Sequence, residues 1–132
     1  MPVTALYAGL LAVLFVYLAA RVIQLRREGR IAVGDGGNAL LLRRMRVHAN
    51  FAEYVPLALI LMALAESLNT WAWLLHIFGA ALLAGRISHA YGVSQLHERY
   101  VFRTTGMAIT FTVIMATALA CIAGAWRAGA GI

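Results

Sequence analysis

Residues 3–25 of the chain read VTALYAGLLAVLFVYLAARVIQL, a run whose only charged residue is Arg21 near its end. A helix needs about 20 apolar residues to cross the hydrocarbon core of a bilayer, so this segment is predicted to be a transmembrane helix. A secretory signal peptide is the alternative interpretation. It is disfavoured because no basic residue precedes Val3, the apolar stretch is too long and a cluster of arginines follows directly.

Three further segments are predicted to be helices, at residues 43–66, 71–91 and 100–126. Between the first two helices, Gly34-Asp35-Gly36-Gly37 indicates a turn rather than a phosphate-binding loop, because the Gly-Lys-Ser/Thr ending of such a loop is missing. Pro56 falls inside the second helix, which membrane helices tolerate. Small residues recur at four-residue spacing in the third and fourth helices, for example Ala81 and Gly85, and this favours close helix packing.

The composition excludes an ordinary water-soluble domain. The chain has 132 residues, of which 63% are hydrophobic and 12% charged, whereas soluble domains are about 45–50% apolar and about 25% charged. Cys121 is the single cysteine, so no disulfide framework or cysteine-based metal site is expected, and the four scattered histidines also argue against a metal. The fold class predicted for residues 1–132 is a single all-α domain, an integral membrane four-helix bundle.

The net charge of +6 is explained by membrane topology. All eleven basic residues are arginines, and ten of them flank the first and third connections, while Arg127 lies near the opposite ends of the helices. By the positive-inside rule, loops 1 and 3 face the cytoplasm and both termini face outward. The same distribution removes the reason to predict nucleic-acid binding, and it leaves membrane lipid as the partner.

The second helix contains polar residues that topology does not require. Arg46, Asn50 and Glu53 are spaced i, i+4 and i+7, which puts them on one stripe. Charges inside a membrane cost about 2.5–3.5 kcal/mol each at mid-span on insertion scales, so Glu53 is a candidate functional residue. A structural ion pair with Arg86 is the alternative. An arginine, an asparagine and a glutamate together suit a small zwitterion with carboxylates and an amine, such as glutathione, although spacing alone does not name it.

These residues belong to a longer pattern. Residues 43–56 read RRMRVHANFAEYVP and are similar to the R-x-x-x-N-x-x-E-[YF]-x-P signature of the membrane-associated proteins in eicosanoid and glutathione metabolism, the MAPEG family. The resemblance also covers residues 22–27 and the GRISHAY segment at residues 85–91, and it extends over nearly the whole chain. It is greatest to the small bacterial inner-membrane branch of the family.

The resemblance implies a homotrimer that binds glutathione between neighbouring subunits near the cytoplasmic face. Arg46, Asn50, Glu53 and Tyr54 match ligand-binding positions of the second helix. Arg26 matches an arginine that a neighbouring subunit contributes from its first helix.

Two histidines also fall at positions that matter in the family. His48 occupies a position where eukaryotic members carry glutamine. His89 occupies a position where leukotriene-synthesising members have tyrosine and other microsomal transferases have histidine. Both are included in the predicted binding site.

The catalytic half of the site departs from the family pattern at two points. Val93 stands where leukotriene-synthesising members have a second tyrosine. The arginine that activates the thiol has two candidates, Arg99 and Arg103, because the preceding connection differs in length. Arg99 is preferred since it lies seven residues before Gly106, as in the microsomal transferases.

The predicted function is a glutathione-dependent transferase or peroxidase that acts on lipophilic electrophiles. An arginine beside the thiol would stabilise the reactive thiolate. A non-catalytic protein that binds glutathione or lipid is the main alternative. A small multidrug exporter is a weaker alternative. Such exporters share a membrane-embedded glutamate in their first helix, and the first predicted span of this chain has no acidic residue.

Overall fold

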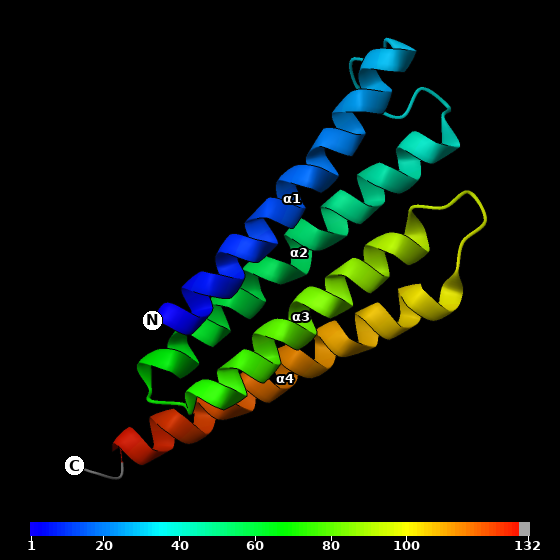
Figure 1. Ribbon diagram of the computed structural model, residues 1–132. Coiled ribbons are helices and arrows are strands. Elements are labelled where there is room, and N and C mark those ends of the chain that lie inside the picture. Colours follow the sequence, from blue (N-terminus) through cyan, green and yellow to red (C-terminus); the bar gives the residue numbers. More distant parts are fainter. Residues whose placement is uncertain (130–132) are drawn as a thin grey trace.

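The computed structural model describes residues 1–129, and the regular structure of this part is entirely α-helical. Four helices follow one another along the chain: α1 (Pro2–Gly29), α2 (Ala39–Ser67), α3 (Ala72–Val93) and α4 (Tyr100–Gly129) (Figure 1). The all-α prediction is confirmed. The largest difference from the predicted ranges is at the first connection, where α1 continues past Leu25 and α2 begins before Arg43.

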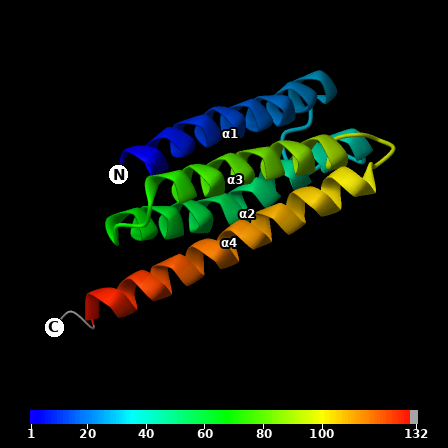
Figure 2. The ribbon, with the colours of Figure 1, turned by 60° about the horizontal axis from the view of Figure 1, so that its bottom comes forward.

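The helices form an up-and-down bundle with both termini at one end. The α1–α2 and α3–α4 connections lie together at the opposite end, and the short α2–α3 connection lies with the termini (Figure 1). α3 packs most extensively against α4, α2 touches all three other helices, and among the described residues α1 and α4 do not meet (Figure 2). The two arginine-rich connections therefore share one end of the molecule.

Helices α1, α2 and α4 are each long and apolar enough to cross a membrane. α3 is not among them, although a span was predicted there, because His76, Arg86 and His89 lower its hydropathy. The last two of these side chains are buried inside the bundle. α3 thus directs its most polar groups toward the other helices.

The first connection has the turn predicted from its glycines. Gly34, Gly36 and Gly37 have φ of 74°, 57° and 77°, values that glycine adopts without strain. The carboxylate of Asp35 accepts from the backbone N–H of Gly37 at 3.1 Å. The side chain of Asn38 then caps α2 by accepting from the backbone N–H of Leu41 at 3.0 Å.

The terminal end of the bundle is held by a carboxylate from another helix. Glu66, at the end of α2, accepts from the backbone N–H groups of Val3 and Thr4 at 3.0 and 2.9 Å. The first N–H groups of a helix have no partner within it, and a negative charge there is favourable. Glu66 therefore caps α1 from across the bundle and joins the two helices at that end.

Glycines allow α3 and α4 to approach closely. A Cβ added to Gly106 would lie 2.5 Å from the carbonyl oxygen of Gly85 and 2.6 Å from the backbone nitrogen of His89. A Cβ on Gly92 would lie 2.5 Å from the backbone nitrogen of Arg103. These neighbours are backbone atoms that have no side-chain freedom to move away, so the spacing of the two helices depends on the absence of side chains here.

We expect the Gly106→Ala substitution to destabilise the bundle. The added methyl group would force α3 and α4 apart, and overpacking of this kind costs about 1–3 kcal/mol. Thermal unfolding in detergent, followed by circular dichroism, measures the effect as a lowered Tm. Gly9→Ala is the matched control, because nothing lies within 4 Å of a Cβ at that helical position. Equal Tm values for the two variants would contradict the role given to Gly106.

Candidate functional site

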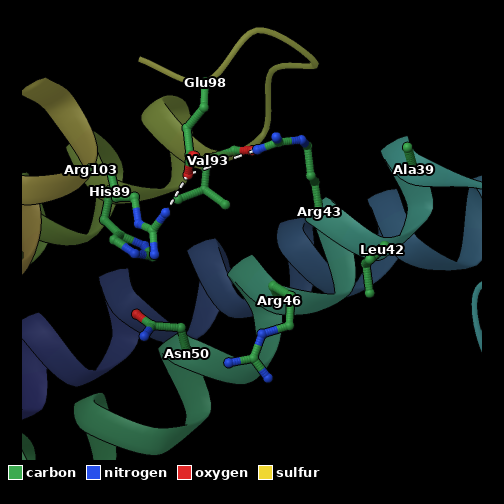
Figure 3. A pocket seen from close by; sticks show the side chains of 9 residues that line it. All are labelled: Ala39, Leu42, Arg43, Arg46, Asn50, His89, Val93, Glu98 and Arg103. Atoms are coloured by element: carbon green, nitrogen blue, oxygen red, sulfur yellow. Dashed lines mark hydrogen bonds and ion pairs between the residues drawn. The ribbon is translucent and has the colours of Figure 1, made fainter. Parts of the chain in front are cut away.

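A pocket of about 340 Å³ opens at the end of the bundle where the first and third connections lie. This volume is within the range of small-molecule sites, about 300–1,000 Å³. α2, α3, the α3–α4 connection and the start of α4 all contribute to its wall (Figure 3). The lining residues are Ala39, Leu42, Arg43, Arg46, Asn50, His89, Val93, Glu98 and Arg103.

Helical spacing brings these side chains to the pocket. Arg43, Arg46 and Asn50 lie at i, i+3 and i+7 on α2, which places them on one face of that helix. His89 and Val93 lie one turn apart on α3. The glycine contacts between α3 and α4 place the first turn of α4, which carries Arg103, beside them.

Glu98 is a pocket residue that was not predicted from the sequence. Its carboxylate accepts from Nη1 of Arg103 at 2.7 Å and lies 3.8 Å from Nη1 of Arg43, and only 10% of its side chain is exposed. Glu98 thus connects α2 to α4 across the pocket (Figure 3). The one sequence signal for it is an isolated acidic residue among arginines in a connection that also carries Arg99.

Four of the predicted site residues meet in this pocket. Arg46 and Asn50 reach it from α2, His89 from α3 and Arg103 from α4. Val93, which departs from the family pattern, is part of the same wall. Arg43, which the charge distribution explained as a topological anchor, also lines the pocket, and its Nη1 donates to the carbonyl of Val93 at 3.5 Å.

The other predicted site residues lie outside the pocket of the single chain. Arg99 precedes α4 and is exposed, so of the two candidate thiol-activating arginines only Arg103 lines the pocket. His48 stacks on Phe15 of α1 with ring centroids 4.5 Å apart. Tyr54 is half-buried and makes an edge contact with Phe111 of α4 at 5.3 Å.

Arg26 lies on a different surface of the molecule. It is half-buried on α1, where its guanidinium donates to the carbonyl of Ala32 at 3.4 Å and to the sulfur of Met45 at 3.5 Å. It borders a second hollow together with Arg27 and Arg30. Within one chain, Arg26 is therefore not part of the wall that Arg46 and Asn50 share.

Glu53 and Arg46 are both exposed on the outer surface of α2. The alternative ion pair between Glu53 and Arg86 is not formed: within residues 1–129 the ion pairs are those of Glu98, and Arg86 bonds to Asn50 instead. An exposed carboxylate in a helix able to span a membrane is costly. The two exposed charges make this face of α2 more polar than an apolar span requires.

The pocket is suited to an anionic ligand. Three arginines, Arg43, Arg46 and Arg103, line it together with the single carboxylate of Glu98. Guanidinium binds carboxylates through two parallel N–H donors, which gives both affinity and orientation. The part of the chain that the structure describes has no group of three or more His, Cys, Asp or Glu residues able to hold a metal ion.

Comparison with known proteins agrees with this architecture. The model of the MAPEG family matches residues 4–123. The chain is 40% identical over 118 residues to the inner membrane protein YecN of Escherichia coli strain K12, covering 89% of this chain and 88% of that protein. The YecN protein of Escherichia coli O6:H1 strain CFT073 matches with the same identity and coverage. A helical bundle of this length, the extent of the family match and the similarity to YecN together show that the chain belongs to the MAPEG family.

Proposed function

We propose that this chain is a glutathione-dependent membrane transferase or peroxidase that acts on lipophilic electrophiles. The observation that carries the proposal is a pocket lined by three arginines, Asn50 and His89 in a member of the MAPEG family. Glutathione has two carboxylates and a thiol, which these donors fit. Its ammonium group needs an acceptor, and Glu53 is the candidate.

In the proposed reaction Arg103 stabilises the thiolate of glutathione. A positive charge next to a thiol lowers the free energy of its deprotonated, nucleophilic form. In conjugation, the thiol proton goes to solvent, the sulfur forms a bond to an electrophilic carbon, and the leaving group departs with its electron pair. In peroxide reduction, two thiols become one disulfide while the hydroperoxide becomes an alcohol and water.

The proposed assembly is a homotrimer with shared sites. The exposed Arg46 and Glu53 of α2 would be covered by a neighbouring subunit, which removes them from lipid. Arg26, which lies away from the pocket of its own chain, would complete a neighbour's site. We further infer a location in the bacterial inner membrane, in line with the name of the Escherichia coli relative, with loops 1 and 3 on the cytoplasmic side.

A non-catalytic binding protein is the second candidate function. Two features of the pocket favour it: Val93 contributes no hydroxyl, and Glu98 already pairs with Arg103. In this case glutathione or a lipid would bind without reaction. Turnover measurements with standard electrophiles and a lipid hydroperoxide decide between the two functions.

The role of Arg103 is tested through the bound thiolate. We expect Arg103→Ala to abolish the ultraviolet difference absorbance of thiolate while part of the glutathione binding is kept, because the other arginines remain. Arg99→Ala is the matched control, since Arg99 is exposed and outside the pocket. If the thiolate absorbance is lost only in Arg99→Ala, Arg99 and not Arg103 stabilises the thiolate. If the absorbance is unchanged in both variants, neither arginine has this role.

Glu98 is expected to compete with the ligand for the guanidinium groups of Arg103 and Arg43. Glu98→Gln removes this competing charge, so glutathione should bind about twofold to fivefold more tightly, the range for a partly exposed ion pair. Isothermal titration calorimetry measures the change. Glu28→Gln removes the same charge at an exposed position of α1 outside the pocket and serves as control. Weaker binding in Glu98→Gln would mean that Glu98 orients Arg103 for the ligand.

Sharing of the site between subunits is tested by complementation. Arg26→Ala and Arg46→Ala should each prevent glutathione binding when expressed alone. Co-expression in equal amounts should restore about a quarter of the sites, because in a random cyclic trimer that fraction of interfaces combines two intact arginines. Native mass spectrometry checks that mixed trimers form. Mixed trimers without recovered binding would show that both arginines act within one subunit, or that Arg26 takes no part.

A further inference from the structure

Arg86 lies directly behind the pocket and is almost completely buried, with 1% of its surface exposed. Its Nη2 donates to Oδ1 of Asn50 at 2.7 Å and lies 3.3 Å from Nδ1 of His89. Its Nη1 faces the sulfur of Met107 at 3.7 Å, and the guanidinium lies 5.7 Å from the ring centre of Phe51. Arg86 thus contacts α2, its own helix α3 and α4.

Arg86 has no acidic partner within the described chain. The ion pairs found in residues 1–129 all belong to Glu98, and the Nε of Arg86 has no hydrogen-bond partner there. A buried charge without a counter-ion is costly, more so in a helix bundle surrounded by lipid. Packing alone does not account for a guanidinium at this position, since an apolar side chain of similar length would avoid that cost.

The chemistry of guanidinium determines how its two neighbours are oriented. Guanidinium has only N–H donors, so each group that it contacts must accept. Asn50 presents its carbonyl oxygen to Arg86, and its NH₂ group remains free. His89 accepts at Nδ1, so its proton is on Nε2. Both residues line the pocket (Figure 3). The N–H groups left to them by these contacts are the NH₂ of Asn50 and the Nε2–H of His89.

We propose that Arg86 is a positioning residue that fixes Asn50 and His89 as hydrogen-bond donors at the inner end of the pocket. That end then receives an anionic oxygen or sulfur group of the ligand, and the ligand's ammonium is directed elsewhere. The assignment of an anionic group to this end rests on the proposed glutathione function. The orientation of Asn50 and His89 does not, because it follows from the contacts of Arg86 alone.

The tautomer of His89 is measured by nitrogen NMR of detergent-solubilised protein labelled with ¹⁵N-histidine, at about pH 8 where imidazole is neutral. His89→Gln identifies the signals of this residue among the four histidines. We expect His89 to carry its proton on Nε2 in the unmodified protein. A proton on Nδ1 would overturn the proposal, and this measurement needs no substitution of Arg86.

Substitution of Arg86 provides the second arm. Arg86→Met keeps the length of the side chain but removes the donors, and the Nε2–H preference of His89 should be lost. Arg86→Lys retains a cation that only donates hydrogen bonds, so His89 should keep its Nε2–H preference. Met107→Leu changes a neighbour of Arg86 outside the pocket and should have no effect. A tautomer that is unchanged in Arg86→Met would overturn the proposal. If Arg86→Met does not fold, the unmodified protein and Arg86→Lys still test the proposal. Loss of the Nε2–H preference of His89 in Arg86→Lys would count against the proposal.

Ligand binding tests the assignment of the anionic group. By calorimetry, the unmodified protein should prefer glutathione over glutathione diethyl ester, in which both carboxylates are blocked. Arg86→Met should lower this preference by about tenfold, the lower end of the range for a hydrogen bond to a charged group. An equal preference in both proteins would refute the role of Arg86 in ligand selection. No binding of glutathione to the unmodified protein would instead refute the proposed function, and the tautomer would still report on Arg86.

Discussion

The close contact between α3 and α4 is the constraint on which the rest of the candidate site depends. Gly85 and Gly106 let the two backbones touch next to His89, and Gly92 lets α3 touch the backbone of Arg103. Without these contacts, the first turn of α4 would stand away from α3. His89 and Arg103 therefore lie in the same pocket because the positions between their helices are glycines.

The polar side chains of the bundle fall into two groups, those buried between the helices and those exposed on its surface. Arg86 and His89 point inward and contact each other, and Arg86 also donates to Asn50. Arg46 and Glu53 are exposed on α2, Arg46 at the pocket and Glu53 outside it. Because lipid solvates charges poorly, inward groups need internal hydrogen bonds and outward groups need another protein surface or water. Within the described chain the first requirement is met in part, because the Nε of Arg86 has no hydrogen-bond partner there.

The two ends of the bundle are built differently. At the terminal end, the carboxylate of Glu66 closes the first turn of α1 and fixes two helices to each other. At the connection end, arginines are in excess and a single carboxylate, that of Glu98, bridges Arg43 and Arg103. Charge at the first end is neutralised by backbone donors, whereas the positive excess at the second end is available to an anionic ligand.

The sequence by itself determined the helices, their membrane character and one stripe of the site. Apolar length predicts a membrane helix directly, and a spacing of i, i+4 and i+7 places residues on one face of a helix whatever surrounds it. This is why Arg46 and Asn50 could be identified before any packing was known. The tertiary structure decided which residues from different helices meet: Arg103 rather than Arg99, the unpredicted Glu98, and Arg86 paired with Asn50 instead of Glu53. These contacts depend on how whole helices are rotated and how far apart they lie. The glycine contacts between α3 and α4 set this geometry, and the periodicity within one helix carries no information about it.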